Sequence, residues 1–456
     1  MTLSHPKLNS VLASGVFNAV NNFSELEEKI KYLSIGEDIS NSSLWKGDVF
    51  EVFCEALILT SPILQAKKVW PKSSLIPPKI AEKLRLRSKD KGVDGLYERF
   101  DGKFISYQAK YYPSRSKLNY GDLGNFFGLS DRVDGKLIIS NCIEIDKETK
   151  DREPQFFNKN NLDNLPDKCW LNLMSLFKKA SQPNSDPIKP DPHQVNAIDD
   201  CLLALKKHNR FQFISACGTG KTLSSLWIAE KYKPKTVLYL VPSLALLEQT
   251  LSEWVNHAES HFPFLSVCSD RKTISYAKDE IIIEKSDLPF EVTTDTNRIG
   301  DWFNATKNYN FRVVFATYDS AKKVAEGLPN NFVIDLAFFD EAHKTAGAAE
   351  KMFTYALWDE NLACAKRIFM TATPKIRKLQ KNSDGDLNVL SMDNINIYGP
   401  VKHRFNFSTA AKNGVIVPFK ILISQVNRVE IEAEKRRGSI TEVDDRLLYT
   451  DHVAHQ

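Results

Sequence analysis

The sequence predicts an α/β protein whose C-terminal half contains a doubly wound parallel sheet. In that half, short apolar runs alternate with helical stretches, which is the pattern of a parallel sheet covered by helices. The strand-like runs are Phe211–Ala216, Thr236–Val241, Arg312–Thr317, Leu336–Phe339 and Arg367–Thr371. Several of them are apolar nearly throughout, as strands buried on both faces should be. A proline-rich segment, residues 179–192, separates this part from an N-terminal block of roughly 175 residues.

Length and composition limit the possible classes of protein. At 456 residues the chain is too long for one hydrophobic core, and we expect two or three domains. The formal net charge of +4 permits nucleic-acid binding but does not by itself indicate it. The seven cysteines include no Cys-x-x-Cys pair, which argues against a disulfide framework and a zinc ribbon. No signal-peptide pattern or long apolar window is present, so we expect a cytoplasmic protein without a membrane partner.

A glycine-rich loop follows the first predicted strand of the C-terminal half. Residues 215–222 have the sequence Ser-Ala-Cys-Gly-Thr-Gly-Lys-Thr. Such a loop offers backbone N–H groups to phosphate oxygens, its lysine reaches the β- and γ-phosphates, and its last hydroxyl can ligate Mg²⁺. The expected nucleotide-binding residues here are Gly218, Thr219, Gly220, Lys221 and Thr222.

A second motif, Asp340-Glu341-Ala342-His343, follows a later predicted strand. It supplies one carboxylate for the metal and another for the attacking water. The carboxyl ends of parallel strands meet at one edge of a sheet, so this motif is expected beside the glycine-rich loop. The two motifs together predict a site for a nucleoside triphosphate and Mg²⁺.

These motifs resemble those of superfamily 2 helicases and translocases, over about residues 190–430. The loop is similar to motif I, Asp340–His343 to motif II and Met370–Pro374 to motif III. The resemblance implies a RecA-like lobe in which Asp340 and Thr222 hold Mg²⁺ and Glu341 polarises water. It also implies that Gln194 reads the adenine of ATP and that His343 couples hydrolysis to movement.

In the N-terminal block, Asp101-Gly102 lies between two alternating apolar runs, which predicts a β-hairpin. An ideal two-residue turn would pair Asp94 with Ala109. Asp94 then lies beside Gln108 and Lys110, which are two residues apart and share one face.

The ideal register, however, directs Asp94 to the other face of the hairpin. We therefore expect a bulge or bend near Gly92 or Gly95 that turns its carboxylate toward Lys110. An acid, a second oxygen ligand and a lysine at one strand end are suited to metal-assisted cleavage of a phosphodiester.

This arrangement resembles the Mrr-like branch of the PD-(D/E)xK nucleases, over about residues 40–145. In that branch a glutamine often replaces the second acid, and a Gly-x-x-x-Glu motif lies upstream. Here Gly47–Glu51 opens the stretch Val49–Leu59, which we expect to be an amphipathic helix. The resemblance implies Mg²⁺ bound by Asp94, Gln108 and Glu51, with Lys110 as a catalytic residue.

The two resemblances give a domain plan. Residues 1–178 form a restriction-endonuclease-like α/β/α domain with its core at 40–145, and residues 179–192 form a linker. We expect residues 193–400 to form the first motor lobe and residues 401–456 to begin a connection to a second lobe, which we expect to be absent. On that expectation, ATP hydrolysis should be weak and the chain should not translocate by itself.

The combination resembles the N-terminal part of type ISP and type I or III restriction enzymes. It implies ATP and Mg²⁺ as cofactors and double-stranded DNA as partner, together with methyltransferase or specificity modules or the missing motor lobe. Two alternatives stay open: a repair or replication helicase whose N-terminal block only binds DNA, and a regulator that uses ATP as a switch.

Overall fold

The computed structural model describes residues 2–32, 42–86, 92–178, 188–269, 288–348, 352–376, 389–417, 440–443 and 446–449. It divides into two compact units, Met1–Phe407 and Ser408–Gln456. Most of the predicted linker, residues 179–187, lies outside the described residues. Its last residue, Pro192, is the first residue of a helix, a position that proline's fixed φ favours.

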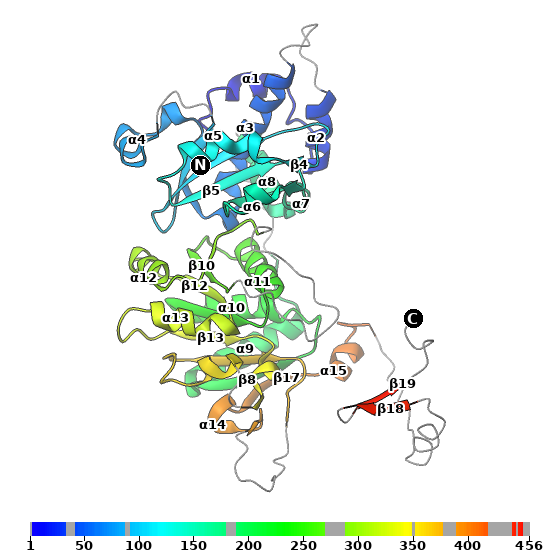
Figure 1. The fold of residues 1–456 in the computed structure, drawn as a ribbon. Helices are drawn as coiled ribbons and strands as arrows, with labels where there is room; N and C mark the ends of the chain where they lie inside the picture. The colour runs from blue at the N-terminus through cyan, green and yellow to red at the C-terminus, as the bar shows by residue number, and fades with distance from the viewer. Residues whose placement is uncertain are drawn as a thin grey trace. The chain divides into compact units, whose positions relative to one another are not determined.

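The N-terminal elements, blue to cyan in Figure 1, surround a five-stranded sheet in the order β1-β2-β3-β5-β7, called here the N-terminal sheet. Its first three strands are antiparallel and its last three are parallel. The strands are β1 Ala66–Trp70, β2 Gly95–Arg99, β3 Phe104–Lys110, β5 Gly135–Ser140 and β7 Gln155–Phe157. Two short strands, β4 Lys117–Leu118 and β6 Glu144–Ile145, pair separately.

Helices cover both faces of the N-terminal sheet. One hydrophobic core joins the face of Tyr97 and Ile105 to α1, α2, α3 and α8, and a second joins the face of Leu96 and Ile138 to α4 and α5. The helices are α1 Leu8–Ala13, α2 Phe23–Tyr32, α3 Ser42–Thr60, α4 Pro78–Leu84, α5 Tyr120–Leu129, α6 Lys147–Lys150, α7 Lys159–Asp163 and α8 Asp167–Lys178, with 3₁₀ turns η2 Pro62–Leu64 and η3 Ser73–Leu75.

Helix α3 corrects the prediction of an amphipathic helix at Val49–Leu59. Its side chains from Val52 to Thr60 are all buried, including Glu55. A helix buried on every side has no polar face, so its sequence is apolar throughout most of its length. Glu51 is partly exposed and lies at the end of this buried stretch.

The β2–β3 hairpin also differs from the predicted register, by one residue. Gly95 pairs with Tyr107, and Arg99 N–H donates to Lys103 O across a three-residue loop that contains Gly102 at φ +79°. Continuing this register places Asp94 opposite Gln108 instead of Ala109. Residues directly opposite each other in an antiparallel pair share one face, so no bulge is needed to turn Asp94.

The C-terminal half contains an eight-stranded sheet in the order β11-β10-β12-β9-β13-β15-β8-β17, called here the ATPase sheet. Every strand pair in it is parallel, as the sequence predicted. The strands are β8 Arg210–Ser215, β9 Thr236–Val241, β10 Phe264–Val267, β11 Val292–Thr293, β12 Arg312–Thr317, β13 Leu336–Phe339, β15 Arg367–Thr371 and β17 Val401–Phe405.

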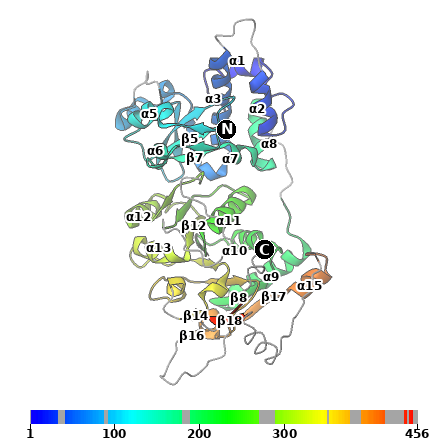
Figure 2. The same ribbon diagram turned by 45° about the vertical axis from the view of Figure 1, so that its right-hand side comes forward.

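The ATPase sheet is doubly wound. Its two cores hold α9, α10 and α11 on one face and α12, α13 and α14 on the other, and Figure 2 shows α10 and α11 across β12 from α12 and α13. The helices are α9 Pro192–Lys207, α10 Lys221–Tyr232, α11 Leu244–His257, α12 Thr296–Ala305, α13 Ala321–Gly327 and α14 Ile395–Tyr398. The short elements are η5 Tyr318–Ser320, η6 Ala342–Thr345, η7 Met352–Leu357, β14 Gly347–Ala348 and β16 Val389–Leu390.

Strand β17 corrects the predicted end of this lobe at residue 400. It pairs with β8 and therefore belongs to the ATPase sheet. The remaining elements are α15 Phe407–Lys412 and the antiparallel pair β18 Ile440–Val443 and β19 Arg446–Tyr449.

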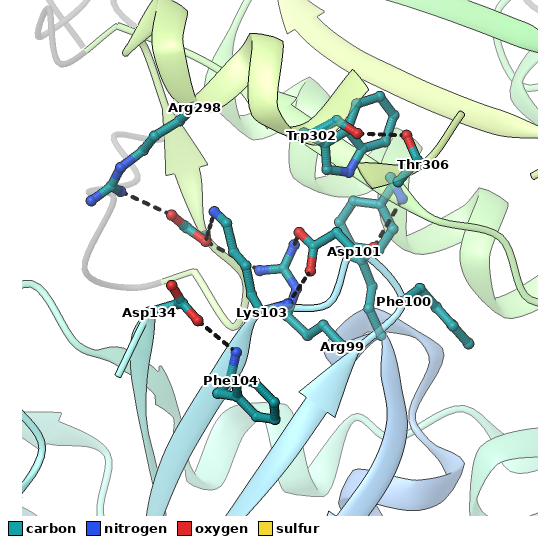
Figure 3. Close-up of polar contacts among 12 residues, drawn as sticks. Arg99, Phe100, Asp101, Lys103, Phe104, Asp134, Arg298, Trp302 and Thr306 are labelled. Carbon is teal, nitrogen blue, oxygen red and sulfur yellow. Dashed lines mark hydrogen bonds and ion pairs between the residues drawn. The ribbon is translucent and has the colours of Figure 1, made fainter. Parts of the chain in front are cut away.

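Within the first unit, the tip of the β2–β3 hairpin contacts the ATPase sheet at its β11 edge (Figure 3). Arg99 forms ion pairs with Asp101 (Nη2–Oδ2 3.0 Å) and with Glu291 (Nη1–Oε2 3.1 Å), which immediately precedes β11. The Tyr309 hydroxyl donates to Phe100 O at 3.0 Å. Buried charged side chains such as Arg99 and Asp101 are stable only when they are paired. The contact between the hairpin tip and the ATPase sheet therefore depends on these ion pairs.

Candidate functional site

The glycine-rich loop connects β8 to the N-terminus of α10. Gly218 and Gly220 have φ of +77° and +74°, a conformation that glycine adopts without strain. The Thr219 hydroxyl donates to Ala216 O at 2.7 Å and is 2.7 Å from the Ser215 hydroxyl, which fixes the loop. Helix α10 begins at Lys221, so its free N–H groups point toward the loop, as an anion-binding site requires.

Lys221 and Thr222, which the sequence placed in the loop, are the first two residues of α10. The Lys221 ammonium donates to Ser215 O at 3.2 Å and to Ala216 O at 3.4 Å, so it is folded back over the loop. These carbonyl contacts hold the lysine close to where phosphates would bind, and anionic phosphate oxygens are stronger acceptors than carbonyls.

Strands β8, β15 and β13 are neighbours, and this order brings motifs I, II and III to one edge of the sheet. His343 Nδ1 is 3.0 Å from Thr371 Oγ1 and 3.2 Å from Glu341 Oε2. The Thr371 hydroxyl in turn accepts from Thr373 N–H at 3.2 Å. His343 therefore contacts both Glu341, the predicted catalytic glutamate, and Thr371 of motif III, and so connects the two motifs.

The two acids of motif II have opposite pKa shifts. Burial, followed by the charge of Glu341, raises the pKa of Asp340 to about 6, although Lys221 opposes this. The hydrogen bond from His343 lowers the pKa of Glu341, and Lys221 adds to that effect. A bound cation would stabilise the ionised form of Asp340, a buried acid with a raised pKa, so this acid is suited to bind a metal. Glu341 has a lowered pKa and is ionised, so it can accept a proton from water.

Gln194 is buried against the glycine-rich loop. Its Nε2 donates to Thr219 O at 3.4 Å, and its Oε1 accepts from Asp191 N–H at 2.8 Å in a capping box of α9. A side chain at Gly220 would collide with this amide. Gln194 therefore packs on the loop, and its contact with adenine stays a prediction.

A second candidate site is a cavity of about 540 Å³ at the end of the β2–β3 hairpin. Asp94, Gln108 and Lys110 all line it, as do residues of α5 and Lys72. Asp94 Oδ2 accepts from Ala109 N–H at 2.7 Å. The structure thus brings together three of the four predicted residues in one cavity.

Gly95 sets the close approach of strands beside this cavity. A Cβ there would lie 2.5 Å from Trp70 O and 2.6 Å from the Tyr107 ring. Only glycine fits between these groups, and it directly follows Asp94 in the chain.

The donors of the cavity fit a divalent cation bound by oxygen. Burial, and then the charge of Glu51, raises the pKa of Asp94 to about 6, so a nearby cation would be favoured. Gln108 is 5% exposed, and its Oε1 is buried without a hydrogen-bond partner. Because an amide oxygen is a good ligand for Mg²⁺, this atom is available to bind the cation. Among the described residues no group of three or more His, Cys, Asp or Glu side chains could hold a metal, so any site here depends on the amide.

Glu51, the fourth predicted residue, is held by two residues that the sequence did not single out. His5 Nε2 is 3.2 Å from Glu51 Oε2, and the Lys72 ammonium donates to the same oxygen. Burial opposes ionisation of Glu51, but hydrogen bonds from His5 and Lys72 outweigh it and lower its pKa. Lys72 follows β1, where the β1–β2 register places it opposite Asp94.

Comparisons with known proteins agree with the motifs of the ATPase sheet. Residues 187–376 match the family model described as Type III restriction enzyme, res subunit. Probable helicase A859L of African swine fever virus (strain Badajoz 1971 Vero-adapted) is 27% identical over 252 residues, which is 55% of this chain and 26% of the viral protein. The protein of isolate Tick/South Africa/Pretoriuskop Pr4/1996 is 29% identical over 230 residues, 50% of this chain and 23% of that protein.

Among solved structures, the ATP-dependent Type ISP restriction-modification enzyme LlaBIII bound to DNA is similar with a TM-score of 0.65 and 26% identity. The similarity covers 87% of this chain and 26% of LlaBIII, so the chain spans about a quarter of the length of these relatives. The chain contains a superfamily 2 helicase-type ATPase domain related to the motors of restriction enzymes. None of the helices in the described part of the chain is both long and apolar enough to span a membrane.

Proposed function

We propose that this chain acts on double-stranded DNA as part of an ATP-dependent restriction or translocation enzyme. In this proposal the ATPase sheet hydrolyses ATP to drive movement on DNA, and the N-terminal sheet cleaves phosphodiester bonds. LlaBIII, whose similarity extends over 87% of this chain, is described as an ATP-dependent restriction-modification enzyme bound to DNA. That description supports DNA as the partner.

In the ATPase site, each residue has a role that follows from its position. Lys221 and the N–H groups at the start of α10 would bind the phosphates, and Thr222 and Asp340 would hold the Mg²⁺ that accompanies ATP. Glu341 orients the attacking water, since its lowered pKa keeps it ionised. Because His343 contacts both Glu341 and Thr371, a change at Glu341 during hydrolysis would alter the position of Thr371 in motif III.

Asp94 and Gln108 in the N-terminal cavity, together with Glu51 outside its lining, would hold Mg²⁺. When bound, this ion polarises the scissile phosphate and lowers the pKa of water. Lys110 lies on the same face as Gln108, two residues along β3, and orients or activates the attacking water. This part of the proposal rests on the position of Asp94 opposite Gln108, whose side-chain oxygen forms no hydrogen bond within the described chain.

The test is Mg²⁺-dependent cleavage of unmodified plasmid DNA by the full chain, beside Asp94→Ala and Glu98→Ala. Glu98 lies on the same hairpin but does not line the cavity, so its variant controls for general damage. Cleavage by wild type and Glu98→Ala but not by Asp94→Ala supports the nuclease. ATP hydrolysis that DNA stimulates, without any cleavage, would instead favour a helicase whose N-terminal block only binds DNA.

A further inference from the structure

Helix α5 forms one wall of the N-terminal cavity, and its sequence is unusual for a helix. Its ten residues include Gly121, Gly124 and Gly128, which lie on one face because they are three and four positions apart. Gly121 and Gly124 line the cavity, whereas Gly128 continues the same face beyond it. We call Gly121 and Gly124 the glycine face.

Neither packing nor backbone conformation requires these glycines. A Cβ at Gly121 or Gly128 would meet nothing within 4 Å, and one at Gly124 would meet only a ring atom of Tyr120 at 3.9 Å. None of the three has a positive φ. Glycine is among the least favourable helix residues, so these positions lower the stability of α5, and no close packing contact requires glycine there. Such local conflicts concentrate at functional sites.

The other residues that line the cavity indicate a ligand. Gln108 lines it with a buried oxygen that has no hydrogen-bond partner, and the cations Lys72 and Lys110 line it as well. The one acid that α5 adds, Asp122, is engaged by Arg115 and by the Tyr112 hydroxyl, both at 3.2 Å. Its charge is therefore largely neutralised, so Lys72 and Lys110 can attract an anionic ligand, while Asp94 and Gln108 keep the oxygens that would bind a cation accompanying it.

We propose that the glycine face admits the sugar–phosphate backbone of duplex DNA to Asp94 and Gln108. This inference rests on the proposed nuclease function. At Gly121 and Gly124 no side chain covers α5, so a strand of DNA can approach the helix backbone there, beside the α5 residues whose side chains also line the cavity, Asp122, Asn125 and Phe126. A longer side chain at Gly121 or Gly124 would occupy that space.

The test compares Gly121→Leu and Gly124→Leu with Gly128→Leu as matched control. Leucine favours helices over glycine, so each variant should raise the Tm of the N-terminal part by roughly 2 °C. The first two variants should lose Mg²⁺-dependent cleavage by roughly 100-fold, as expected when a substrate is displaced by about 1 Å or more. Gly128→Leu should cleave like the wild type.

A second readout separates this inference from the nuclease itself. Hydrogen exchange of the α5 amides is measured in EDTA with and without a short duplex oligonucleotide. Protection of α5 by DNA in the wild type and in Gly128→Leu, lost in Gly124→Leu, supports the glycine face even if no variant cleaves DNA. In that case only the nuclease proposal fails.

Three results would overturn the inference. One is DNA that binds the chain without protecting α5, and another is a duplex that does not bind at all. The third is Gly121→Leu and Gly124→Leu that both cleave at the wild-type rate, which would place the DNA elsewhere while the nuclease proposal stands.

Discussion

Replacing Asp101 by alanine should destabilise the hairpin that carries the proposed cleavage site. The Asp101 side chain is 1% exposed and that of its partner Arg99 is 6% exposed. Without Asp101, the buried guanidinium keeps only Glu291, whose side chain is 19% exposed. Arg99 Nε already has no partner in the described structure, so the loss of Asp101 would leave a second nitrogen of this buried guanidinium unpaired.

The magnitude follows from this burial. Removing one partner of a buried ion pair costs about 3–5 kcal/mol, and the remaining pair with Glu291 places Asp101→Ala near the lower limit. The hydrogen bond from Lys103 N–H to Asp101 Oδ1, 3.2 Å long, is lost as well and contributes about 1 kcal/mol. We therefore expect the free energy of opening of β2 and β3 to fall by about 4 kcal/mol.

Native-state hydrogen exchange of the β2 and β3 amides measures this free energy directly. The control is Glu98→Ala on the same hairpin, whose pair with Lys67 spans 3.3 Å between side chains 23% and 55% exposed. Such an exposed pair contributes about 0.5 kcal/mol or less. A change below about 1 kcal/mol for Asp101→Ala, or one equal to that of the control, would refute the reasoning that this ion pair is buried and needed.

Three further variants test the two candidate sites. Glu341→Gln should lower ATP hydrolysis by roughly 100-fold or more in a phosphate-release assay while ATP binding is kept, because it removes the acceptor for the proton of water. His343→Ala removes the hydrogen bond that lowers the pKa of Glu341, so the acid limb of the ATPase pH profile should move to higher pH, and an unchanged profile would contradict this contact. Lys72→Met should raise Mn²⁺ affinity by about tenfold in a titration followed by electron paramagnetic resonance, because the ammonium and a metal compete for Glu51. A loss of affinity would mean that Lys72 only positions that carboxylate.

The sequence predicted most strands of the ATPase sheet that are buried on both faces, although the four-residue strand β10, which is also buried throughout, was not predicted. The predicted bounds of β9, β12, β13 and β15 agree with the structure because continuous apolar runs are distinct from their surroundings. Strand β17 was missed since it lies at the sheet edge, where Lys402 and Arg404 alternate with buried His403 and Phe405. Short strands such as β11 depend on tertiary pairing and carry little local signal.

The candidate residues of the N-terminal cavity were predicted from one strand pair, and the errors come from what lies outside it. The three-residue loop at Gly102 could not be distinguished from a two-residue turn, because Asp-Gly suits both. Lys72 has no motif of its own. It reaches Asp94 only through the pairing of β1 with β2, which is a long-range contact.

The corrected register gives the β2–β3 hairpin two functional ends. Its tip, at Asp101, contacts the ATPase sheet, and its base carries Asp94 and Gln108, roughly 20 Å away at the rise of a β-strand. A strand pair of this length is stiff when both faces are packed, as they are here. Asp101→Ala therefore separates two possibilities when DNA cleavage and hydrogen exchange are measured together. If cleavage falls while the amides near Asp94 keep their protection, the tip transmits the state of the ATPase sheet to the cavity. If cleavage is unchanged, the tip contact only holds the two sheets together.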